Sequence, residues 1–136
     1  MIGLILVSHG RVGEVLLQTA SEIVGEFDSA ESLTIERYDD CEQVHSQLEE
    51  LIQKVDQGQG VIILADMFGG TACNISLRLV ESYKIEVVTG MNLPMLLKLN
   101  IERVKNNDVS SVAQLVKYYG QRNIMVAGDV LKEREL

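Results

Sequence analysis

The chain has 136 residues, of which 46% are hydrophobic and 24% are charged, and this length and composition predict one globular domain spanning residues 1–136. Twelve Lys and Arg residues stand against 20 Asp and Glu residues, and the net charge of −8 has the wrong sign for a phosphate-backbone partner. The first apolar run, residues 2–7, is too short to cross a bilayer, and no basic region or cleavage site accompanies it. We therefore expect a cytoplasmic protein that does not bind nucleic acid.

The predicted elements begin with two strand and helix pairs. Residues 2–7 form a continuous apolar run, which indicates a strand buried on both faces, and a stripe of helical spacing follows over residues 12–23 and ends at Gly25. Residues 33–38 alternate between apolar and polar side chains, which suits a strand nearer an edge of the sheet. A second helical stripe follows over residues 44–55.

The same alternation continues through the second half of the chain. Residues 61–65 are another continuous apolar run, followed by a helical pattern over residues 75–80 and a strand over residues 86–89. A further helix is predicted between Asp108 as its N-cap and Gly120 as its end.

A last apolar run, residues 124–126, predicts one more short strand. Strands that alternate with helices require right-handed crossovers, so the fold class is α/β, with an open, mainly parallel sheet and helices on both faces. Ligands of such folds bind beyond the carboxyl ends of the strands. The search for a site therefore reduces to the loops that follow the strands.

Polar residues in these loops predict a histidine and aspartate pair. His9 follows the first strand and Asp66 the third, and adjacent parallel strands would bring the two side chains within reach. A carboxylate that accepts a hydrogen bond from one imidazole N–H fixes the tautomer and leaves the other nitrogen free to attack. The same pair could act as a general base, or His9 could be a structural residue at the strand end, but its position favours a nucleophile.

The loop after Asp66 adds a candidate phosphate site. Gly69 and Gly70 allow the backbone to approach a ligand closely, and Thr71 can begin a helix whose N–H groups and dipole attract an anion. The alternative is an ordinary turn in which Thr71 caps the helix. The two cysteines, Cys41 and Cys73, are too few for a disulfide framework or a zinc site. Neither a Gly-x-Gly-x-x-Gly motif, a Gly-Lys-Ser/Thr phosphate loop nor a metal-ligand cluster stands in the sequence, so we expect neither a metal nor a cofactor.

Three motifs in register resemble the IIA component of mannose-family phosphotransferase systems: LVSHG at residues 6–10, LADMFGGTACN at residues 64–74 and GMNLPML at residues 90–96. Their order and spacing extend the resemblance over nearly the whole chain. It implies a phosphotransferase, in which His9 takes a phosphoryl group from phospho-HPr and passes it to a IIB component. The sugar would then be imported through the membrane components IIC and IID.

The resemblance also implies roles for individual residues. Asp66 matches the partner carboxylate of the histidine, and Gly69, Gly70 and Thr71 match the turn and helix start that receive the phosphoryl oxygens. Four further residues are candidates for contacts with partner proteins, with packing against the core as the alternative: Met67, Phe68, Met91 and Asn92.

The family is typically a homodimer in which a C-terminal strand crosses to the other subunit, and residues 124–126 are the candidate strand here, unless they fold back onto their own sheet. Three other functions stay open: a phosphorylation-sensing domain of a transcriptional activator, the phosphocarrier of a dihydroxyacetone kinase system, and an anion binder whose His9 is never phosphorylated. A chain that starts at Met1 and ends soon after its last strand favours a free-standing component. The transported sugar, whether mannose, fructose, sorbose, an amino sugar or gluconate, is not encoded in this chain.

Overall fold

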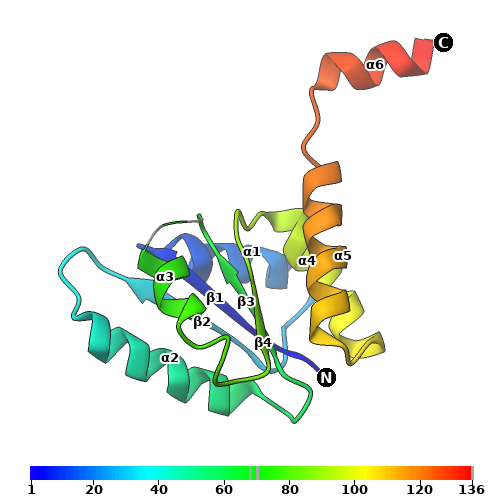
Figure 1. The fold of residues 1–136 in the computed structure, drawn as a ribbon. Helices are drawn as coiled ribbons and strands as arrows, with labels where there is room; N and C mark the ends of the chain where they lie inside the picture. Colours follow the sequence, from blue (N-terminus) through cyan, green and yellow to red (C-terminus); the bar gives the residue numbers. More distant parts are fainter. Residues whose placement is uncertain (68, 70, 136) are drawn as a thin grey trace.

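Four strands form one parallel sheet in the computed structural model, which describes residues 1–67, 69 and 71–135 (Figure 1). The strands are β1 (Gly3–His9), β2 (Ala30–Ile35), β3 (Val61–Ala65) and β4 (Ile85–Val88). Their order across the sheet is β2-β1-β3-β4, and every pairing is parallel. The predicted α/β fold with a parallel sheet is thus confirmed, and the carboxyl ends of β1 and β3 lie side by side.

Helices cover both faces of the sheet, as predicted. The helices α1 (Val12–Val24), α4 (Leu93–Lys105) and α5 (Val109–Arg122) pack against one face, and α2 (Cys41–Val55) and α3 (Thr71–Leu77) pack against the other. In β1, Leu4 and Leu6 contact the first group, whereas Ile5 and Val7 contact the second, because successive side chains of a strand point to opposite faces. No helix among the described residues has the length and apolar character needed to cross a membrane.

The second strand is an edge strand, as its alternation indicates, but it lies earlier in the chain than predicted. It spans Ala30–Ile35 rather than residues 33–38, and Ala30 pairs with Leu4 at the start of the ladder. The strand ends at Ile35 because the next N–H group, that of Glu36, donates to the carboxylate of Asp39 at 2.8 Å. This turn places residues 36–40 in a loop beside the carboxyl end of β1.

The helix α4 was not predicted from the sequence, and a buried arginine explains why. Leu96, Leu99 and Arg103 face the interior, so that a charged residue interrupts the apolar stripe. The Arg103 side chain is 1% exposed and donates to the backbone carbonyls of Ile2 at 3.3 Å and Ser29 at 3.2 Å. It thereby connects the last turn of α4 to the starts of β1 and β2.

The C-terminal segment differs from its prediction in two respects. The helix α5 does not end at Gly120 but continues to Arg122, and the glycine is needed because a Cβ at this position would collide with the Met95 side chain. Residues 124–126 form no strand within this chain, and the sheet order β2-β1-β3-β4 does not include them. They are exposed and lead into α6 (Ala127–Glu135), which extends away from the sheet (Figure 1).

Candidate functional site

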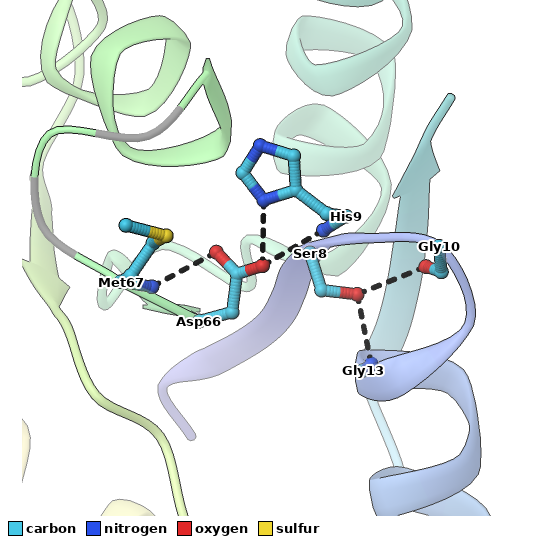
Figure 2. Close-up of polar contacts among 6 residues, drawn as sticks. All are labelled: Ser8, His9, Gly10, Gly13, Asp66 and Met67. Carbon is cyan, nitrogen blue, oxygen red and sulfur yellow. Dashed lines mark hydrogen bonds and ion pairs between the residues drawn. The ribbon is translucent and has the colours of Figure 1, made fainter. Parts of the chain in front are cut away.

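His9 and Asp66, which the sequence predicts to meet, are in direct contact at the carboxyl edge of the sheet (Figure 2). His9 is the last residue of β1, and Asp66 follows the last residue of the neighbouring strand β3. The Nδ1 atom of His9 lies 2.7 Å from Oδ2 of Asp66, and the backbone N–H of His9 donates to the same oxygen at 2.9 Å. The backbone N–H of Met67 donates to Oδ1 at 2.9 Å, so that three hydrogen bonds from the described residues fix the carboxylate.

These hydrogen bonds determine which ring nitrogen of His9 is free. Burial raises the pKa of the Asp66 carboxyl, but the hydrogen bonds from the backbone and ring of His9 outweigh it, and the pKa lies below its usual value. An ionised carboxylate can only accept, so Nδ1 carries the proton. In the neutral ring the lone pair is then on Nε2, at the ring edge away from Asp66 (Figure 2). The side chain of His9 is 46% exposed, which leaves the ring accessible to another molecule.

Ser8 is a site residue that the sequence reasoning missed. Its side chain is fully buried, and its hydroxyl donates to the carbonyl of Gly10 at 3.1 Å and accepts from the N–H of Gly13 at 2.8 Å (Figure 2). Gly10 has a φ of +57°, a conformation that glycine adopts most easily. Ser8 therefore holds the turn after His9 against the first turn of α1. Its only signal in the sequence is a hydroxyl at the end of an otherwise apolar strand.

We expect Ser8→Ala to lower the free energy of unfolding by about 1–3 kcal/mol, because the N–H of Gly13 would be left buried without its acceptor. Ser21→Ala is the matched control. Among the described residues the Ser21 hydroxyl donates only to the carbonyl of Leu17 in its own helix, at 2.9 Å, and its loss should change stability by less than about 0.5 kcal/mol. Urea denaturation followed by circular dichroism measures both variants. Equal losses would show that the Ser8 hydroxyl does not hold this turn.

The candidate phosphate turn is only partly described by the structure. Gly69 has a φ of +81°, with open space where a Cβ would stand. The backbone of Thr71 begins α3, while its side chain, like Phe68 and Gly70, lies outside the described residues. Gly69 stands three residues after Asp66 in the sequence, so the turn belongs to the connection that leaves β3 beside His9.

The remaining candidates for partner contacts have different environments. Met67, next to Asp66, is 55% exposed. Met91 is half-buried against the core between the sheet and α1, α4 and α5. The side chain of Asn92 accepts from the N–H of Met95 at 3.0 Å and so caps α4. Met91 and Asn92 thus have structural contacts, whereas Met67 faces solvent.

The fold and the site together define a class: an α/β domain that presents a half-exposed, aspartate-oriented histidine at the carboxyl edge of a parallel sheet. Within the described ranges, no group of three or more His, Cys, Asp or Glu residues is arranged to hold a metal ion. The family model EIIA-man, described as the phosphotransferase system (PTS) fructose IIA component, matches residues 3–117. The chain therefore belongs to this family of IIA components of sugar phosphotransferase systems.

Individual relatives agree with this assignment. The mannose-specific EIIAB component of Escherichia coli strain K12 is 26% identical over 124 residues, which are 90% of this chain but 38% of that protein, so the chain spans well under half of its length. The sorbose-specific EIIA component of Lacticaseibacillus casei is 30% identical over 118 residues, covering 85% of this chain and 80% of the relative. The solved structure of a mannose/sorbose-specific IIA subunit from Enterococcus faecalis superposes with a TM-score of 0.83 at 28% identity, covering 92% of this chain and 93% of that one.

Proposed function

We propose that this protein is a phosphohistidine carrier, which accepts a phosphoryl group from phospho-HPr on Nε2 of His9 and passes it to a IIB component. The observation that carries the proposal is the hydrogen bond between Nδ1 and Asp66, which holds the ring proton on one nitrogen and leaves the other able to attack. Membership of the IIA family supports the same role in sugar uptake and phosphorylation. The proposal places the protein in the cytoplasm, where IIB in turn serves the membrane components IIC and IID.

The proposed transfer requires no net change of protons. The lone pair of Nε2 attacks the phosphorus of the donor phosphohistidine, the N–P bond of the donor breaks, and its electron pair returns to the donor ring. The phosphorylated ring of His9 keeps its proton on Nδ1 and is therefore positive. The Asp66 carboxylate, 2.7 Å away, stabilises this charge as it develops. Transfer to IIB is the same exchange with His9 as the donor.

The turn after β3 is the proposed receptor for the phosphoryl oxygens. A phosphoryl group in transfer needs positioning and hydrogen-bond donors for its equatorial oxygens, and backbone N–H groups supply these. Gly69 has the open left-handed conformation that lets the backbone approach a ligand, and α3 begins two residues later at Thr71. Gly70, which stands between them in the sequence, belongs to the same proposal by its place in the family motif.

Incubation with phospho-HPr tests the proposal directly. Intact-mass measurement should show the addition of one phosphoryl group, and the adduct should be lost in acid and kept in base, as expected for a phosphoramidate. Subsequent addition of a IIB component should remove the group. The absence of an adduct, or an adduct that survives acid, would contradict the proposal. An adduct that no IIB component removes would favour the regulatory alternative.

We also propose that two copies form a homodimer in which residues 124–126 of each add a strand to β4 of the other. β4 is an edge of the described sheet. Beside it runs a groove of about 410 Å³, lined by Val87 and Gly90 on the strand side, by Ala113 and Lys117 of α5, and at its end by this chain's own Ile124. The three side chains that would form the strand are apolar and 76%, 63% and 68% exposed: Ile124, Met125 and Val126. An unpaired edge and an exposed apolar segment complement each other.

Two truncations test the exchange. The full chain should be a dimer by light scattering, a chain ending at Asn123 should be a monomer, and a chain ending at Val126, which lacks only α6, should remain a dimer. A monomeric full chain would rule the exchange out, as would a chain ending at Asn123 that stays fully dimeric.

A further inference from the structure

A pocket of about 450 Å³ opens beside His9 on the side of β2, whereas Asp66 holds the ring from the side of β3. Its floor is apolar and consists of Ile35, Val44 and Ile75, which come from β2, α2 and α3. Because Nδ1 is bound to Asp66, Nε2 stands on the ring edge away from that carboxylate (Figure 2). A group attached to Nε2 is therefore directed away from Asp66, on a residue that itself lines this pocket.

A phosphoryl group stored here would bring two negative charges into a chain whose net charge is already −8. The acidic residues that line the pocket are Glu36 and Asp39, and Asp39 is held in the loop by the 2.8 Å hydrogen bond from the N–H of Glu36. Among the described residues that line the pocket, Arg37 is the one with a permanent positive charge. It stands in the loop that turns away from the sheet after Ile35.

Two arginines stand near His9, and their surroundings differ. Arg11, two residues after His9, is paired with Glu14, with nitrogen to oxygen distances of 3.3 and 3.4 Å. Arg37 has no ion-pair partner among the described residues, and its guanidinium lies 5.5 Å from the centre of the Tyr38 ring, which is itself 88% exposed. The charge of Arg11 is thus compensated, whereas the hydrogen-bonding groups of Arg37 are available to a ligand.

We infer that Arg37 binds the phosphoryl group, donating hydrogen bonds to its oxygens while it moves onto Nε2 and while it is stored there. This inference rests on the proposed function of His9. The planar guanidinium presents paired N–H donors whose geometry matches phosphate, and an arginine keeps its charge at every physiological pH. Arg37 forms and breaks no covalent bond. In this proposal it acts together with the N–H donors of the turn after β3.

Two donors of different size test the inference. Phospho-HPr presents a phosphohistidine on a protein surface, whereas inorganic phosphoramidate presents only the phosphoryl group and releases ammonia when its N–P bond breaks. Arg37→Gln should slow the phosphorylation of His9 by about tenfold or more with both donors, because a contact with the phosphoryl group is lost in both reactions. Arg37→Lys should recover part of the rate, since it restores the charge but not the planar pair of donors. Arg11→Gln, the matched control, should stay within about twofold of the wild type, because Arg11 already serves Glu14.

The outcomes separate this inference from the proposed function. If the wild-type protein takes a phosphoryl group from neither donor, the proposed function fails. If the wild type is phosphorylated and Arg37→Gln matches it with phosphoramidate, the inference is overturned while the role of His9 stands, and a loss confined to phospho-HPr would then assign Arg37 to protein docking. An equal loss in Arg11→Gln would also overturn it, because any nearby positive charge would then have the same effect.

Discussion

Replacing His9 by alanine is expected to abolish phosphorylation by phospho-HPr, whereas His45→Ala should leave it intact. These are the two histidines of the chain, and each has a carboxylate beside Nδ1. His45 lies within α2, 3.4 Å from Glu49, and its side chain is 18% exposed, compared with 46% for His9. The pair of variants therefore asks whether a contact with a carboxylate is sufficient, or whether the exposed position at the end of β1 is also required.

Intact-mass measurement after timed incubation gives the phosphorylated fraction of both variants. His9→Ala should still fold, because the half-exposed ring contributes little to the core, and circular dichroism checks this. An adduct on His9→Ala would show that a residue other than His9 accepts the phosphoryl group. A loss of phosphorylation in a folded His45→Ala variant would show that His45, rather than His9 alone, is needed for the reaction.

The part of the fold that places the site could be predicted from local patterns alone. The continuous apolar run over residues 61–65 coincides with β3, and the strand ends predict the contact between His9 and Asp66, although the two residues are far apart in the chain. The reason is general: parallel strands align their carboxyl ends, so a residue just after a buried run has a known place in the fold.

Features that depend on distant contacts could not be predicted in this way. Arg103 faces the interior because backbone carbonyls at the starts of β1 and β2 accept its hydrogen bonds, whereas sequence rules place arginine on the surface. Gly120 has the sequence signal of a helix end, but its real role is to let α5 approach Met95 of α4. In both cases the determining partner lies on another element.

The position of Arg37 shows how a small boundary error affects a functional interpretation. A strand over residues 33–38 would place Arg37 within the sheet. The hydrogen bond from the N–H of Glu36 to Asp39 instead ends β2 at Ile35 and moves Arg37 into the loop that borders the pocket beside His9. The Asp39 side chain takes the N–H group of Glu36 that the sheet would otherwise use. This one hydrogen bond decides whether Arg37 is a strand residue or a candidate ligand of the phosphoryl group.

Asp66→Asn should keep the fold but slow transfer from phospho-HPr by about 10²- to 10⁴-fold. In the part of the chain that the structure describes, three N–H donors converge on the two carboxylate oxygens, two from His9 and one from Met67. An amide can replace only one of these oxygens as an acceptor. If the amide NH₂ faces the ring, Nδ1 must accept a hydrogen bond from it. The ring proton then moves to Nε2, which no longer has a free lone pair to attack the phosphorus. If the amide oxygen faces the ring, the tautomer is kept, but no negative charge stabilises the phosphorylated ring.

Asp40→Asn is the control for this variant, because it removes the same charge from a nearby loop. Asp40 caps α2 by accepting from the N–H of Glu42 at 3.1 Å, a role that asparagine fills equally well. We expect the single-turnover rate of Asp40→Asn, measured by rapid quench, to lie within about twofold of the wild-type rate. If Asp66→Asn transfers the phosphoryl group at the wild-type rate, the carboxylate of Asp66 is not needed for transfer. An equal loss in Asp40→Asn would attribute the effect to overall charge, whereas a loss in Asp66→Asn alone requires the carboxylate at the position where it holds the Nδ1 proton.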